Sequence, residues 1–344
     1  MLPPIFLCSP STEQSHVIAK LINKYQPNRL ITGIIMPNEA FPKKIKLINT
    51  LLPANSLHLA AIDGTLIPTG AASTKFYLER NDVILGNITL TQNALKVFDK
   101  PWLLDKADAI GVPIPTTWGN INSISIYPVF YKQRFEKGGG VRGIAYTQKE
   151  IPKAHYSDLI FQELIISSGT YGVSFLAESG KILCSHSHFE RESIPKSGGS
   201  AVIIENFSDK KLLNHTKILL ESLNYSGWGL AEYKYCPKRC DYVLMEINAK
   251  FWASCELAFI NEPAFLKLLF NINASRENLN RIVFLDRAIQ RGIPFLLKYI
   301  FFLTPFIQVR LYPGWGKRIL LRIIPDSLYT PIKKGLSFLS NKSL

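Results

Sequence analysis

Apolar and polar residues alternate along the first 95 residues with two different periods. Short apolar runs such as "PIFLCS", "LHLAAID" and "DVILG" have the length and composition of buried strands. Between them, "TEQSHVIAKLINKY" and "ASTKFYLER" repeat apolar residues at the spacing of amphipathic helices. Strands that alternate with helices are typical of a parallel sheet, so we expect a small α/β domain over residues 1–95.

The pattern changes after residue 95. The run "TQNALKVFDKPWLLDKADAIGVPIP" predicts two helices that end at Gly111 and the prolines after it, and "SISIYPVFYKQ" predicts a strand. From residue 156 to 270 most apolar runs predict strands, with one helix at "DKKLLNHTKILLESLNY". We therefore expect two α+β lobes, a small lobe over 96–155 and a large lobe over 156–270.

The stretch "LAEYKYCPKRCDYVLMEINAK" predicts a β-hairpin that turns at "PKRCD". If the turn is centred on Arg239, Glu232 lies directly opposite Glu246, and Asn248 follows on the same face. Like charges in opposite positions destabilise a sheet unless a cation offsets them. Two carboxylates and an amide oxygen are hard ligands that suit Mg²⁺ or Mn²⁺. A polar stripe facing solvent, with the glutamates paired to Lys234 and Lys250, is the alternative.

A lysine and a glycine-rich loop come earlier in the chain. Lys132 lies in the strand-like run "YPVFYKQ", and the loop after it carries Gly138, Gly139, Gly140, Arg142 and Gly143. Glycine backbone can approach a phosphate closely and donate its N–H groups. The loop matches the spacing of a dinucleotide-binding turn, but "IAYTQ" after it is strand-like rather than helical, so we reject that interpretation. It also lacks the Gly-Lys-Ser/Thr ending of a Walker A loop.

Six segments in this order resemble the ATP-grasp superfamily, the fold of biotin carboxylase, carbamoyl-phosphate synthase and D-Ala-D-Ala ligase. They are "FDKPWLLDKADAIGVPIP", "YPVFYK", "GGGVRG", "FQELI", "GLAEYKY" and "LMEINAKFW". The resemblance covers about residues 95 to 270 and implies that residues 1–95 form the domain that often precedes this fold.

The resemblance implies a role for each matching residue. Lys100 and Lys132 would hold the phosphates of ATP, the glycine loop would close over them, and Glu163, Leu164 and Ile165 would hold the adenine. Glu232, Glu246 and Asn248 match the magnesium ligands. Lys250 stands where the family usually carries Arg, which keeps the charge but loses the bidentate fork. An acidic residue soon after "FQELI", which usually holds the ribose, is absent from this sequence.

The stretch "SHSHFERESIPKSGGSA" falls between these motifs. We expect His188 and Arg191 to meet an anionic substrate or the terminal phosphate, with an ordinary polar hairpin as the alternative.

The reaction that the resemblance implies is the activation of a carboxylate by ATP as an acyl-phosphate, followed by attack of an amine. The expected partners are therefore small-molecule carboxylate and amine substrates. The alternative is a catalytically weak nucleotide-binding adaptor attached to a membrane through its basic tail. Because degenerate members usually lose an acid or the strand lysine, the retained Lys132, Glu232, Glu246 and Asn248 favour an enzyme.

Charge gathers at the carboxyl-terminal end. The net charge is +14 over 344 residues, and residues 271–344 alone carry twelve Lys and Arg against three acids. Basic residues interleaved with Trp315, Leu320 and Leu321 suit a helix on an anionic membrane surface, while packing on the protein's own core is the alternative. Its apolar run is shorter than a membrane span. We find no nucleic-acid-reading motif and expect no nucleic-acid partner.

Five scattered cysteines and an amino terminus without a charged signal region favour a reducing compartment over a disulfide framework. We therefore expect a cytoplasmic protein, with peripheral contact at the inner membrane face as a further expectation.

Overall fold

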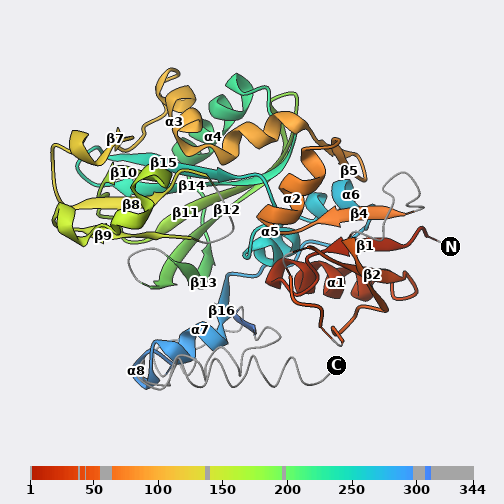
Figure 1. Cartoon of the computed structure of the whole chain (residues 1–344). Helices are drawn as coiled ribbons and strands as arrows, with labels where there is room; N and C mark the ends of the chain where they lie inside the picture. Colours follow the sequence, from red (N-terminus) through yellow and green to blue (C-terminus); the bar gives the residue numbers. More distant parts are fainter. Residues whose placement is uncertain are drawn as a thin grey trace.

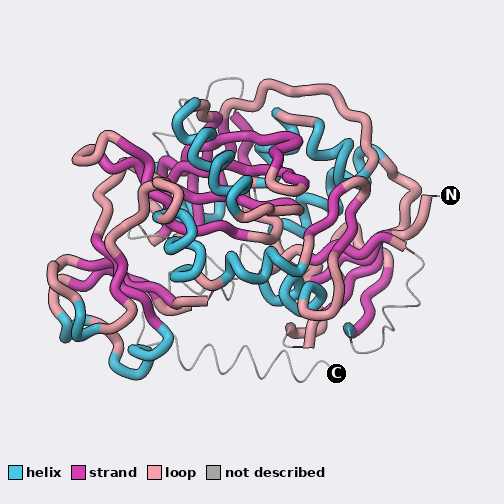
Figure 2. The backbone as a smooth tube through the Cα atoms, turned by 90° about the horizontal axis from the view of Figure 1, so that it is seen from above, coloured by secondary structure: helices cyan, strands magenta, loops and turns pink. Residues whose placement is uncertain are grey.

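The computed structural model describes residues 2–296 and 307–310, apart from 38, 43, 55–63, 136–139 and 196–198. Figure 1 shows the amino-terminal domain on one side of the molecule, a small lobe on the other, and a large sheet between them. Seen from above, the three larger sheets form separate groups of strands (Figure 2).

The amino-terminal domain contains a parallel sheet, as predicted, and the order of its strands is β3-β2-β1-β4. Thr12 caps the first helix, because its hydroxyl accepts the backbone N–H of Ser15. The run "DVILG" is a strand, but it forms a separate antiparallel ribbon with the strand after it, while all of "LHLAAID" lies outside the described residues. The elements are β1 (Ile5–Cys8), α1 (Glu13–Tyr25), β2 (Ile31–Ile35), β3 (Thr50–Pro53), β4 (Thr65–Pro68), α2 (Ala71–Leu78), β5 (Val83–Leu85) and β6 (Ile88–Leu90).

The small lobe is an antiparallel sheet in the order β7-β10-β8-β9. The first of the two helices predicted before it is a 3₁₀ helix, η3, and the predicted strand "SISIYPVFYKQ" is a strand only from Val129 on. The sheet has its own core, and it takes in a strand that follows residue 155. The elements are η3 (Gln92–Phe98), α3 (Lys100–Asp108), β7 (Thr117–Trp118), η4 (Ile121–Ser123), β8 (Val129–Gln133), β9 (Arg142–Ala145), η5 (Gln148–Glu150), η6 (Lys153–Asp158) and β10 (Leu159–Glu163).

The large lobe is built on a seven-stranded sheet in the order β15-β14-β11-β12-β13-β16-β17. It shares one hydrophobic core with the amino-terminal domain, including Trp228, Phe251 and Phe265. The elements are β11 (Thr170–Glu178), β12 (Lys181–Ile194), β13 (Ser200–Asn206), α4 (Lys210–Ser222), β14 (Gly227–Cys236), β15 (Asp241–Asn248), α5 (Cys255–Asn261), α6 (Ala264–Phe270), β16 (Arg281–Phe284), α7 (Leu285–Gln290), α8 (Ile293–Leu296) and β17 (Ile307–Arg310).

The described part of the basic carboxyl-terminal segment packs on the protein. β16 pairs with β13, and β17 extends the sheet beside β16. Trp315, Leu320 and Leu321, on which the predicted membrane helix depends, lie outside the described residues, so membrane contact stays a prediction. Within the described ranges, no helix combines the length and apolar character needed to cross a bilayer.

Two ion pairs join α1 to the segment after residue 270. On the buried side, the Arg287 guanidinium bonds Glu13 and donates to the Ala201 carbonyl at 2.7 Å. On the exposed side, Lys24 pairs with Glu277 at 3.1 Å. Because removing one partner of a buried pair is far more costly than breaking an exposed pair, the first contact anchors the domain interface.

We expect Arg287→Ala to lower the free energy of unfolding by about 3 kcal/mol, because Glu13 and the Ala201 carbonyl both lose a buried donor. Lys24→Ala, the matched control at the exposed ion pair of the same interface, should cost under about 1 kcal/mol. Urea unfolding of both variants measures the difference, and equal losses would show that Arg287 does not anchor the interface.

Candidate functional site

The hairpin of β14 and β15 places two carboxylates face to face. Glu232 is directly opposite Glu246, and Leu230 is opposite Asn248, as the sequence predicts. Nearer the turn the register shifts by one residue, because Tyr233 pairs with Leu244 and leaves Met245 as an extra residue. The predicted pairing therefore holds at the acid pair only because a β-bulge lies beside it.

The bulge gives Lys132 a partner in the other lobe. The Lys132 ammonium, on β8 of the small lobe, donates to the Met245 carbonyl at 2.9 Å and lies 3.4 Å from Glu246 Oε2. A bulged residue leaves the regular ladder, which frees its carbonyl for such a contact. Only 7% of Lys132 is exposed, so this cation is held inside the interface between the lobes.

Lys100 approaches the same carboxylate from a different element. It is the first residue of α3, a helix that packs against β15, and its backbone N–H donates to the Arg134 carbonyl at 3.2 Å. Its ammonium lies 3.7 Å from Glu246 Oε2. Two lysines far apart in sequence thus converge on one oxygen of Glu246, and we call Lys100, Lys132, Glu232, Glu246 and Asn248 the lysine–acid cluster.

Burial and charge act in opposite directions on the pKa values of this cluster. Burial raises the pKa of Glu246, but Lys132, Lys100 and Lys250 together with a hydrogen bond from Asn248 outweigh it and hold the pKa at about 2. Burial lowers the pKa of Lys132, and the Glu246 charge partly offsets that shift. Glu246 is therefore an anion at neutral pH, although only 19% of its side chain is exposed.

Asn248 links the acids to Lys250. Its amide nitrogen donates to Glu232 at 3.1 Å and to Glu246 at 3.3 Å, while Lys250 donates to its oxygen at 2.6 Å. Asn248 is only 5% exposed, so the alternative of a solvent-facing stripe does not describe this face of the hairpin.

The oxygen donors of the cluster fit a hard divalent cation. Two opposed carboxylates with an amide oxygen beside them supply the ligand type that Mg²⁺ takes, with its other ligands drawn from water and phosphate. Rotating the Asn248 amide would turn its oxygen toward the acids. The cluster has only two such acids, and the described part of the chain holds no group of three or more His, Cys, Asp or Glu residues that could hold a metal ion.

Glu163, which the sequence singled out, holds the hinge between the lobes together with Thr116 and Arg239, which it did not assign to the site. The Glu163 carboxylate accepts the Thr116 backbone N–H at 3.0 Å and the Arg239 guanidinium from the hairpin turn. Ile165 packs with Cys236, Val243 and Met245 in a small buried cluster, and Leu164 lies between Glu163 and Ile165. Arg239 lies in a polar turn that sequence alone treats as solvated, so no local signal marks its reach to the hinge.

His188 lies on the same row of the large sheet as the acid pair. Gly172 of β11 is opposite Glu232 on one side and His188 on the other. A Cβ at Gly172 would lie 2.4 Å from the imidazole, so the missing side chain makes room for the His188 ring. His188 is 1% exposed, and its Nε2 lies 3.3 Å from the Ser254 hydroxyl and 3.9 Å from Glu190.

The contacts of Arg191 and Lys234 differ from those that the sequence predicts. Arg191 sits at a register shift in β12, and its guanidinium pairs with Glu205 at 2.6 Å and lies over the Phe189 ring. Lys234 donates to Thr170 at 3.3 Å, and burial lowers its pKa while Glu190 and Glu232 raise it. Alternation along β14 puts Lys234 on the face of Glu232, a signal that the sequence contained.

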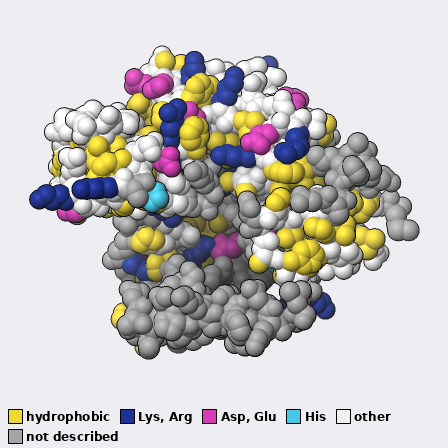
Figure 3. Space-filling view, viewed as in Figure 1, with side chains coloured by type: hydrophobic (Ala, Val, Ile, Leu, Met, Phe, Trp, Pro, Cys, Tyr) yellow, Lys and Arg dark blue, Asp and Glu magenta, His cyan; other side chains and the backbone are white. Residues whose placement is uncertain are grey.

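The glycine loop is described only in part, because Gly138 and Gly139 lie outside the described residues. Gly140 has φ +119°, and a Cβ at Gly143 would lie 2.5 Å from the Tyr131 hydroxyl, so both positions require glycine. Arg142 opens β9 directly opposite Lys132, with its side chain exposed. Figure 3 shows a recess in the middle of one face, where acidic and basic side chains are both visible.

No known family profile matches the sequence, and no curated protein matches it. Solved structures do match. An N5-carboxyaminoimidazole ribonucleotide synthetase in complex with ADP has a TM-score of 0.62 and 14% identity over 84% of each chain. A Campylobacter jejuni biotin carboxylase complex has a TM-score of 0.56 and 13% identity, covering 80% of this chain and 72% of that one.

Rhizobium etli pyruvate carboxylase has a TM-score of 0.58 and 11% identity over 76% of this chain, which spans only 28% of that longer one. At these identities the likeness concerns the fold alone. Over these shares of the chain, the matches show that it has the ATP-grasp fold.

Proposed function

We propose that the protein is an ATP-dependent ligase that joins a carboxylate to an amine and releases ADP and phosphate. The observation that carries this proposal is the convergence of Lys100 and Lys132 on Glu246, directly opposite Glu232. Buried lysines beside paired acids form a cleft with positive groups for phosphates and negative groups for a divalent cation. The matches to an ADP complex and to a biotin carboxylase complex with a nucleotide support the same choice.

Nucleotide binding would use both lobes. Lys100 and Lys132 would leave Glu246 and bind phosphate oxygens, because the phosphates carry more negative charge. The glycine loop with Arg142 would cover the phosphates. The base would lie along the hinge backbone from Glu163 to Ile165, beside the buried cluster that includes Met245. Phosphate and base would therefore tie the small lobe to the hairpin and exclude water from the cleft.

Glu232, Glu246 and Asn248 would hold Mg²⁺ or Mn²⁺, which would supply further neutralisation of phosphate charge. Lys250, which donates to the Asn248 oxygen, would release that oxygen for the cation and contact the transferred phosphoryl group. We assign His188 to the same site, because it continues the row of Glu232 and Gly172. Arg191 would serve the substrate only after leaving Glu205.

In the proposed reaction a substrate carboxylate oxygen attacks the γ-phosphorus of ATP, and the bond from that phosphorus to the bridging oxygen breaks to release ADP. The amine then attacks the acyl-phosphate carbon, phosphate departs, and the nitrogen loses a proton. The buried lysines stabilise charge on the phosphoryl group, and the site requires no Ser or Cys nucleophile.

A nucleotide-binding adaptor without turnover is the competing function. It predicts Mg-ATP binding but no phosphate release with any substrate. The retained acid pair and its two lysines favour the enzyme, because proteins of this fold that lose turnover usually lose an acid or the strand lysine, and this chain keeps both.

Lys132→Ala should weaken binding of a non-hydrolysable Mg-ATP analogue about 10- to 100-fold in isothermal calorimetry, because a charge-assisted contact to phosphate is lost. Arg134→Ala, an exposed cation just after the same strand, should leave binding within about twofold. Equal losses would place the nucleotide outside the cleft.

A screen of phosphate release from ATP against pools of carboxylates and amines tests the reaction directly. We expect release that needs one carboxylate and one amine together, and loss of at least about 100-fold in Glu246→Gln, because a ligand of the divalent cation is removed. Glu178→Gln, at an exposed carboxylate, is the control. Nucleotide binding without release in any pool would favour the adaptor.

The low pKa of Glu246 predicts a pH dependence of stability. Its pKa falls from the usual 4.5 to about 2 on folding, so its contribution is present above pH 4.5 and is lost as pH falls toward 2. Glu246→Gln should therefore be less stable than the wild type by up to about 3 kcal/mol at pH 6, and the difference should narrow toward pH 2. Urea unfolding of both proteins across this range checks it, and a constant difference would contradict it.

A further inference from the structure

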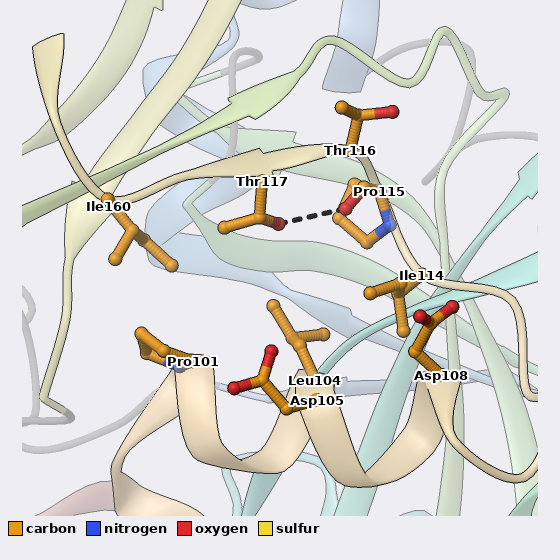
Figure 4. Close-up of a pocket in the computed structure, with 10 residues that line it drawn as sticks. Pro101, Leu104, Asp105, Asp108, Ile114, Pro115, Thr116, Thr117 and Ile160 are labelled. Carbon is orange, nitrogen blue, oxygen red and sulfur yellow. Dashed lines mark hydrogen bonds between the residues drawn. The ribbon is translucent and has the colours of Figure 1, made fainter. Parts of the chain in front are cut away.

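A pocket lies between α3 and the strands β7 and β10, outside the lysine–acid cluster. It has a volume of about 420 Å³, within the usual range of small-molecule sites. Figure 4 shows α3 on one side and the segment before β7 on the other, with Ile160 of β10 between them. Its lining residues are Pro101, Leu104, Asp105, Asp108, Ile114, Pro115, Thr116, Thr117, Gly119 and Ile160.

The walls of the pocket belong to elements that also hold the nucleotide cleft. The helix α3 begins at Lys100, and Thr116 holds the Glu163 carboxylate at the hinge. None of the residues of the lysine–acid cluster lines the pocket. The pocket is therefore separate from that cluster, although an occupant would contact the same framework.

The pocket has an apolar floor and an acidic rim. Leu104, Pro115 and Ile160 are buried, whereas Asp105 and Asp108 are exposed. The two aspartates are three residues apart, so both carboxylates lie on one face of α3, and Figure 4 shows them beside the pocket. Within the described part of the chain, neither carboxylate has an ion pair or a side-chain hydrogen bond.

A buried side-chain oxygen without a hydrogen bond lies in the sheet next to the pocket. Gln162 is fully buried, and its amide nitrogen donates to the Thr117 hydroxyl at 3.1 Å. Its oxygen accepts no hydrogen bond from any described residue. Gln162 lies on the face of β10 that carries Ile160 to the pocket, but its oxygen is buried behind Thr117 and does not line the pocket.

We propose that this pocket binds a small molecule with an aliphatic body and a primary ammonium group. The aliphatic body would cover the floor between Leu104 and Ile160. The ammonium has three hydrogens, so it would donate two to the carboxylates and one to the Thr116 hydroxyl, which belongs to an exposed residue of the lining. Neutral or anionic molecules have no positive charge to pair with the aspartates of the rim. The charge and the length of the aliphatic chain therefore together define the class of ligand. The inference does not rest on the proposed ligase activity.

The test titrates nucleotide-free protein with pentylammonium chloride and follows the backbone ¹⁵N signals of Thr116, Thr117 and Gly119. We expect saturable shifts with an affinity in the millimolar range, as suits about six non-hydrogen atoms. Pentanol keeps the body without the charge, and methylammonium keeps the charge without the body. Each should bind at least about fivefold more weakly than pentylammonium.

Two variants locate the site. Asp105→Asn combined with Asp108→Asn should weaken pentylammonium binding about tenfold, while Glu178→Gln should leave it unchanged. Gly119→Leu fills the pocket from its rim, where a Cβ has no atom within 4 Å, and should abolish the shifts without unfolding the protein. Equal binding of pentanol and pentylammonium, unchanged binding in the double variant, or absence of saturable shifts would overturn the proposal. Circular dichroism checks that each variant is folded.

Discussion

The repulsion between Glu232 and Glu246 is the constraint around which the site is organised. Opposed carboxylates destabilise a sheet, and this pair lies where little water can screen it. The structure offsets the repulsion with two lysines and an amide rather than by separating the acids. Lys132 reaches them because a bulge exposes the Met245 carbonyl, and Lys100 reaches them because α3 begins beside β15.

The same contacts join two bodies with separate cores. The small lobe has its own apolar cluster around Val129 and Phe161, whereas the large lobe shares its core with the amino-terminal domain. Lys132 crosses between the lobes, and Glu163 with Arg239 holds the hinge near it. Any group that competes for these lysines therefore also acts on the contact between the lobes.

The residues next to the acid pair on the large sheet give the site a distinct set of polar groups. Gly172 leaves the sheet open beside Glu232, and the His188 ring fills that space. Lys234 and Glu190 continue the polar surface on the same face, so buried charge extends across several strands. Substrate selection in such a site depends on which of these groups an incoming molecule can satisfy, because a buried polar group without a partner is costly.

Local sequence determined the hairpin, the first strand of the amino-terminal parallel sheet and the opposition of Glu232 and Glu246, because turn chemistry and strand alternation act over a few residues. Local sequence did not predict the bulge at Met245. The hairpin registers with and without the bulge differ only in how they pack against other elements. Tertiary structure alone decided that Lys100 and Lys132 meet at Glu246, that Arg191 turns to Glu205, and that β16 and β17 extend the sheet. These contacts join residues far apart in sequence, and their free energy comes from burial that no local pattern encodes.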